Sequence, residues 1–134
     1  MRAFVTVLAG TLLLTASANA APRLSPEARL AQALEGRVAG EPVNCINTSR
    51  VRSSRIIDDT AIVYDAGSTI YVNHPRAGRE SLDRGDTLVT RQFTSQLCST
   101  DVVELYDTSA RIHTGLVFLG KFIPYKKVRT RSSR

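Results

Sequence analysis

The chain has 134 residues, of which 43% are hydrophobic and 22% are charged, with 18 basic against 12 acidic side chains. This length supports one domain with a modest core and leaves no room for a second domain of ordinary size. The formal net charge is +6, and six of the 18 basic residues lie after residue 120: Lys121, Lys126, Lys127, Arg129, Arg131 and Arg134. The rest of the chain is close to neutral, which argues against a nucleic-acid-binding domain.

Residues 1–20 have the features of a secretory signal peptide. Arg2 precedes an apolar stretch over residues 3–14, and small residues follow as far as Ala18-Asn19-Ala20, which matches an A-x-A cleavage pattern. The apolar stretch is shorter than the run of about 20 residues that spans a bilayer. We therefore expect cleavage after Ala20, export to the periplasm or the extracellular space, and no transmembrane segment in the mature chain.

Residues 21–43 are predicted to form an N-terminal helix and a linker. Ser25 before Pro26 favours a helix start, because the serine oxygen can accept a backbone N–H and proline needs no acceptor. Leu30, Leu34 and Val38 recur every four residues, which predicts a helix over residues 26–36 with a frayed end reaching 39. A disordered pro-segment is the alternative, since one leucine stripe on a short helix is marginal alone.

Residues 44–125 are predicted to form a single β-rich domain, because short β-branched and aromatic runs alternate with turn formers. Strands are expected at residues 50–57, 60–65, 69–73, 87–93, 102–107 and 115–123, and Asp65 with Gly67 indicates a tight hairpin turn. The fold class is therefore mostly β, a small antiparallel barrel or sandwich of about six strands with a short N-terminal helix. The tyrosines on these strands are either packing residues or an aromatic ligand-binding face: Tyr64, Tyr71 and Tyr106.

Cys45 and Cys98 are the two cysteines of the chain. Export would place them in an oxidising compartment, where they can form a disulfide. In the chain-entropy model a bridge that encloses residues 46–97 contributes about 4 kcal/mol of stability. Two separate buried thiols are the alternative.

Asp58 and Asp59 interrupt the β-branched run in RIIDDTAIVYDAGSTIYVN, residues 55–73. In an extended strand neighbouring side chains point to opposite faces, so these carboxylates could not share a proton as a catalytic pair. At a corner, both carboxylates would face solvent and promote the turn. We therefore predict a turn at this pair and no catalytic role.

No other motif predicts chemistry. GLVFLGKF, residues 115–122, has the G-x-x-x-x-G-K spacing of a phosphate-binding loop, but Phe122 stands where that loop needs a Ser or Thr to reach Mg²⁺. His74 and His113 are in no metal-ligand spacing, although a pair joined through an aspartate in space stays open. No serine lies in a G-x-S-x-G elbow. The sequence therefore predicts no catalytic, cofactor-binding or metal-binding residue.

Residues 126–134 are predicted to form a basic flexible tail. Its candidate contacts with an anionic surface are Lys126, Lys127, Arg129, Arg131 and Arg134. Near a charged membrane each basic residue contributes about 1 kcal/mol, and salt weakens the attraction. A solvated terminus without a function is the alternative.

Several short motifs carry a resemblance to a known family: Cys45-Ile46, IDDTAIVY at 57–64, YVN at 71–73, QLCSTD at 96–101 and LGKFIPY at 119–125. Over residues 43–126 the chain resembles a family of small exported proteobacterial proteins that share a domain of unknown function. The resemblance implies export and a compact β-rich domain, and it brings no known catalytic residue. Members often carry further cysteines near the position of Leu82 and just before Leu119, and this chain lacks both.

The leading interpretation is an exported, non-enzymatic binding or structural module of the cell envelope. Its expected partner is an anionic envelope surface or another envelope protein, and we expect no cofactor and no nucleic acid. The alternative is a small periplasmic enzyme, hydrolase-like, whose site is assembled only in space.

Overall fold

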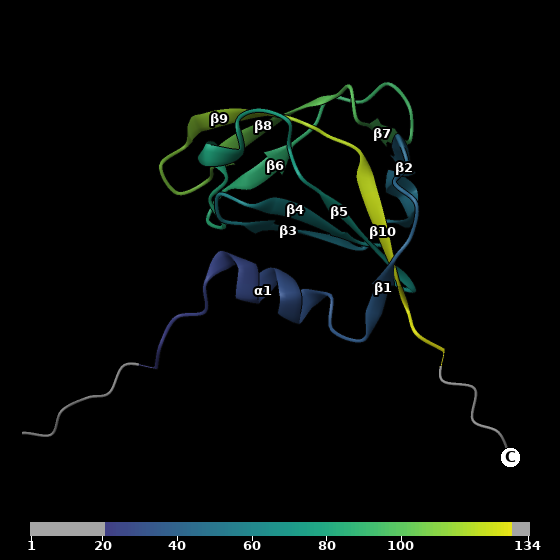
Figure 1. Cartoon of the computed structure of the whole chain (residues 1–134). Helices are drawn as coiled ribbons and strands as arrows, with labels where there is room; N and C mark the ends of the chain where they lie inside the picture. Colours follow the sequence, from purple (N-terminus) through teal and green to yellow (C-terminus); the bar gives the residue numbers. More distant parts are fainter. Residues whose placement is uncertain (1–20, 130–134) are drawn as a thin grey trace, which may run out of the picture.

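The computed structural model describes residues 21–129 (Figure 1). The predicted signal peptide, residues 1–20, and the end of the predicted tail, residues 130–134, lie outside the described residues. The elements follow in the order α1 (Pro26–Ala33), β1 (Arg37–Ala39), β2 (Cys45–Asn47), η1 (Thr48–Arg50), β3 (Ser53–Ile57), β4 (Ala61–Asp65), β5 (Thr69–Asn73), η2 (Arg79–Ser81), β6 (Thr87–Val89), β7 (Gln96–Cys98), β8 (Val102–Asp107), β9 (Ile112–Phe118) and β10 (Phe122–Lys127). Across residues 21–129, no helix is long and apolar enough to cross a membrane.

Five strands form the central sheet in the order β1-β10-β5-β4-β3, with every neighbouring pair antiparallel. The turn between β4 and β5 is the one predicted: Gly67 has a φ of 82°, and its N–H donates to Asp65 Oδ1 at 2.7 Å. The turn between β3 and β4 is closed by the Thr60 N–H, which donates to the Ile57 carbonyl at 3.0 Å. Local turn chemistry therefore sets the order of three consecutive strands.

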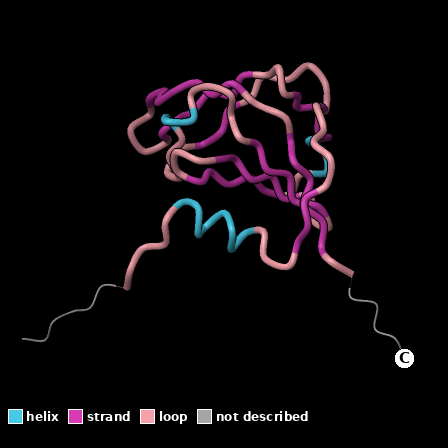
Figure 2. The backbone as a smooth tube through the Cα atoms, in the orientation of Figure 1, coloured by secondary structure: helices cyan, strands magenta, loops and turns pink. Residues whose placement is uncertain are grey.

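Two smaller sheets and α1 complete the layers. One small sheet has the order β6-β8-β9, and the other pairs β2 with β7. Figures 1 and 2 show the three-stranded sheet over one face of the central sheet and α1 against the opposite face. The predicted mostly β fold class is confirmed. Of the two architectures left open, the described sheets form a sandwich-like arrangement and do not close into a barrel.

The central sheet separates two apolar cores. Phe122 and Ile62 are fully buried in the larger core, on the face covered by the smaller sheets. Val63, the neighbour of Ile62, belongs to the other core, where Leu30 of α1 and Leu34, the residue after the helix, pack against β3, β4 and β5. Because adjacent residues of a strand face opposite sides, β4 is buried on both faces and reads as a continuous apolar run.

The helix prediction is confirmed at its start and wrong at its end. Ser25 caps α1, since its Oγ accepts a backbone N–H of the first turn at 3.2 Å. The helix ends at Ala33, before the predicted position 36. Gly36 turns the chain with a φ of 69°, and Arg37–Ala39 then pairs with β10 as a strand. Val38, predicted on the frayed helical end, is therefore 59% exposed on β1.

Three observed strands were not predicted, because β1, β2 and β7 have three residues each, which is too short to establish a two-residue period in the sequence. The predicted strands at 50–57 and 87–93 are shorter in the structure, where they span Ser53–Ile57 and Thr87–Val89. Pairing with remote segments, rather than local sequence, selects β1, which pairs with β10, and β2, which pairs with β7.

The single strand predicted over residues 115–123 is wrong, because the chain bends at Gly120 between β9 and β10. Asn73 is fully buried, and its side chain takes both backbone groups of Gly120: Nδ2 donates to the carbonyl at 2.7 Å, and Oδ1 accepts the N–H at 3.0 Å. These two hydrogen bonds satisfy the backbone at the bend. A separate β10 then continues through Lys126 and Lys127, which the sequence placed in the flexible tail.

The predicted disulfide is confirmed. Cys45 and Cys98 are bonded with an S–S distance of 2.07 Å, and they face each other across β2 and β7. The next register pair, Ile46 with Leu97, is buried in the larger core. The bridge therefore fastens a very short sheet onto one side of the main core.

Candidate functional site

Three basic side chains, Lys126, Lys127 and Arg129, are exposed at the end of β10 and just after it. They are called the basic end below. One surface hollow of about 690 Å³ beside them is also bounded by Ser68 and Thr69, and another of about 540 Å³ lies on the β1 side. Figure 1 shows this strand end leaving the body of the protein at one corner.

The basic end has no acidic partner among the described residues. The three arginine ion pairs within residues 21–129, and the contact of His113 with Glu104, all use Asp58 or Glu104. Exposed cations without a partner contribute little to the stability of a fold, so the basic end is free to meet an external anion. The two other predicted contacts, Arg131 and Arg134, lie outside the described residues.

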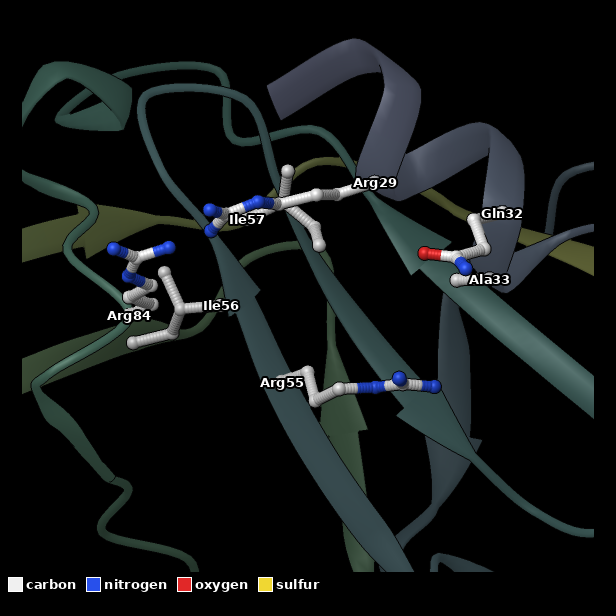
Figure 3. A pocket seen from close by; sticks show the side chains of 7 residues that line it. All are labelled: Arg29, Gln32, Ala33, Arg55, Ile56, Ile57 and Arg84. Atoms are coloured by element: carbon white, nitrogen blue, oxygen red, sulfur yellow. The ribbon is translucent and has the colours of Figure 1, made fainter. Parts of the chain in front are cut away.

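A second cationic site lies between α1 and β3, and sequence reasoning missed it. Arg29, Arg55 and Arg84 line a hollow of about 470 Å³, here called the arginine pocket (Figure 3). These arginines come from α1, β3 and the loop before β6, and no sequence spacing links them. The arginine pocket and the basic end lie at opposite ends of the central sheet. Lys126 of the basic end is in register with Thr69 at the start of β5, whereas the arginine pocket lies at the Ile57 end of β3.

The paired aspartates form the predicted turn, and Asp59 adopts a φ of 51° and is exposed. The expectation that both carboxylates face solvent is wrong for Asp58. Its Oδ1 accepts the Arg84 N–H at 2.8 Å, and its Oδ2 lies 3.6 Å from Arg29 Nη1 and 3.9 Å from Arg84 Nε. Asp58 therefore connects the turn to α1 and to the loop before β6.

The two histidines lie on different parts of the surface. His74 is exposed in the loop after β5, with Nδ1 at 3.4 Å from the Thr60 carbonyl oxygen. His113 is exposed on β9, with Nδ1 at 3.6 Å from Glu104 Oε2 and its ring edge-on to Tyr106. Among residues 21–129, no group of three or more His, Cys, Asp or Glu side chains is placed to hold a metal ion.

Of the three strand tyrosines, Tyr64 and Tyr71 pack in the larger core, whereas Tyr106 does not belong to either core. Tyr64 is 5% exposed and packs edge-on to Phe122, with ring centroids 5.8 Å apart. Burial raises the pKa of the Tyr64 hydroxyl well above its ordinary value, because the phenolate would lose its hydration. Tyr71 of β5 lies beside Tyr64 of β4, whereas Tyr106 is on β8 in the three-stranded sheet.

The segment with phosphate-loop spacing is part of β9 and the bend after it. Val117 and Leu119 are fully buried in the larger core, so these residues cannot wrap a triphosphate. The Gly120 N–H, which a phosphate would need, donates to Asn73.

Comparison of the chain with family models, with curated proteins and with solved structures finds no match. The family resemblance drawn from the sequence motifs therefore stays a prediction.

Proposed function

We propose that this protein is an exported, non-enzymatic binding module that is held on an anionic surface of the cell envelope by its basic end. The observation that carries the proposal is the unpaired charge at the end of β10, where Lys126, Lys127 and Arg129 are exposed and have no acidic partner within residues 21–129.

The corner that displays these charges is held firmly. The Arg37 guanidinium of β1 donates to the Ser68 carbonyl at 3.0 Å and to the Tyr125 carbonyl at 3.4 Å. Lys126 and Lys127 belong to β10 by their backbone pairing with β1 and β5. A fixed display loses less conformational entropy on binding than a flexible tail does, which supports a surface-contact role.

Export is supported by the signal-like residues 1–20 and by the Cys45–Cys98 disulfide, since disulfides persist in oxidising compartments. At about 1 kcal/mol for each basic residue near an anionic membrane, the three cations of the basic end supply weak, reversible attachment. Such attachment is strongly reduced by salt.

The test is co-sedimentation of the mature, disulfide-bonded protein with neutral vesicles, with anionic vesicles and with isolated envelope fragments across a salt series. The test variant is Lys126→Gln/Lys127→Gln, which keeps the backbone pairing of β10. The control is Arg79→Gln/Arg91→Gln, which removes the same charge from exposed positions elsewhere.

We expect wild type and the control to sediment with anionic material at low salt and to be released at high salt. The test variant should bind distinctly more weakly. Equal weakening of both variants would mean that only overall charge matters, and it would refute the proposal. Binding that does not change across the salt series would also refute it.

A further inference from the structure

We propose that the arginine pocket binds the oxyanion group of a small solute, a carboxylate or a phosphate, between the guanidinium groups of Arg29 and Arg84. This site is independent of the basic end, from which it is separated by the width and length of the central sheet.

The charge of the pocket is not balanced by the described chain. Its lining holds three guanidinium groups, and Asp58 is the one carboxylate within ion-pair distance of them in residues 21–129. The two aspartates of the neighbouring loop are engaged elsewhere: Asp83 Oδ1 accepts the Gly85 N–H at 2.7 Å, and Asp86 accepts the Thr114 hydroxyl.

Asp58 leaves the guanidinium donors largely unused. Its Oδ1 is occupied by the Arg84 backbone N–H, and its Oδ2 lies 3.6 and 3.9 Å from the nearest nitrogens of Arg29 and Arg84. Charge-assisted hydrogen bonds of guanidinium groups are shorter, at about 2.7–2.9 Å. Asp58 Oδ2 therefore lies near the guanidinium groups of Arg29 and Arg84 but forms no short hydrogen bond with either of them.

Two of the three arginine side chains, those of Arg29 and Arg84, converge from separate elements, whereas the Arg55 guanidinium points away from them (Figure 3). Figure 3 shows the Arg29 and Arg84 guanidinium groups pointing toward each other across the β3 turn, with the Gln32 carboxamide projecting from α1 on the same side of the sheet. Arg29 is only 26% exposed and Arg84 is 50% exposed. Planar guanidinium groups recognise carboxylates and phosphates through paired N–H donors, and two such groups face each other here.

The size of the hollow is compatible with a small solute. About 470 Å³ falls within the range of small-molecule sites and exceeds what a single phosphate fills. Ile57 and Ala33 supply apolar lining beside the arginines. We therefore assign the pocket to a compact solute that carries an oxyanion.

The experiment is calorimetric titration of the mature, disulfide-bonded protein with pyrophosphate and, separately, with citrate, at constant ionic strength with chloride as the balancing anion. We expect saturable one-site binding of at least one of these probes. Comparing them identifies phosphate or carboxylate as the preferred group.

Arg29→Gln and Arg84→Gln should each weaken binding about tenfold, which corresponds to the loss of one charge-assisted contact. Arg91→Gln is the matched control, because Arg91 makes a similarly long ion pair of 3.6 Å with Glu104 outside the pocket. Lys126→Gln/Lys127→Gln should also leave the titration unchanged.

Asp58→Asn tests whether Arg29 and Arg84 bind an external anion or serve only to hold Asp58 in the fold. The amide oxygen can still accept the Arg84 N–H, but the competing charge is gone, so we expect tighter binding of the anion. If Arg29→Gln fails to fold, Arg29→Lys keeps the charge without the fork and should still bind more weakly. Absence of saturable binding by wild type, weaker binding by Asp58→Asn, or equal weakening in Arg91→Gln would overturn the proposal.

Discussion

Replacing both cysteines by serine, Cys45→Ser with Cys98→Ser, should remove a large part of the stability of this domain. The bridge joins positions 53 residues apart, and the chain-entropy model assigns such a loop about 4 kcal/mol at 25 °C. Both side chains are partly exposed, so their replacement leaves no large cavity. Few interactions compensate for the loss, because β2 and β7 share three register pairs.

Urea unfolding followed by circular dichroism and by tyrosine fluorescence measures this loss, since the chain has 4 tyrosines and no tryptophan. With a slope of about 1.5 kcal/mol per M for a domain of this size, the midpoint should fall by about 2.7 M. Wild type unfolded in the presence of reductant should match the double variant. A loss below about 1 kcal/mol would refute the reasoning, because the unfolded chain would then gain little freedom from opening the loop.

Three further changes test the cores and the bends. Asn73→Asp should destabilise by about 3 kcal/mol in urea unfolding, because a carboxylate would replace the amide that donates to the Gly120 carbonyl; a loss under about 1 kcal/mol would contradict this role. Tyr64→Phe removes a buried hydroxyl that has no hydrogen-bond partner in the described residues, so at neutral pH we expect no loss, or a gain of up to about 1 kcal/mol. Above pH 10 the unfolded tyrosine ionises while the buried one stays protonated, because burial raises its folded-state pKa. Wild type should therefore lose stability relative to Tyr64→Phe by up to about 1.4 kcal/mol per pH unit, and parallel pH curves would refute this. Gly78→Ala should lower the free energy of unfolding by about 3 kcal/mol, because the added methyl group would overlap the backbone of β9. Gly36→Ala is the control: Gly36 also has a positive φ but lies in open space, so the loss should be about 1 kcal/mol. Equal shifts in melting temperature for the two variants would contradict the overlap.

The parts of the fold that sequence predicted are those that depend on local chemistry. Ser25 caps its helix and Asp65 holds the Gly67 turn through contacts with neighbours in the chain. The parts that it missed depend on distant partners. β1 is a strand because β10 lies beside it, and β9 ends at Phe118, just before the Gly120 backbone that the Asn73 side chain binds from another strand.

The candidate sites divide in the same way. The basic residues near the C-terminus are visible as a composition bias, although their sequence did not reveal that Lys126 and Lys127 belong to a strand. The three arginines of the arginine pocket, Arg29, Arg55 and Arg84, come from three separate parts of the chain. Because these residues meet only when α1, β3 and the loop before β6 pack together, no spacing in the sequence indicates the pocket.

The position of β10 determines when the protein can finish folding. This last strand lies between β1 and β5, and its residue Lys127 pairs with Arg37 near the opposite end of the chain. Until β10 arrives, β5 presents an unpaired edge of the kind that promotes aggregation, and pairing over such long separations is slow. The central sheet can therefore be completed only after Phe122–Lys127 has been made, and Lys126 and Lys127 take their places when β10 pairs with β1 and β5.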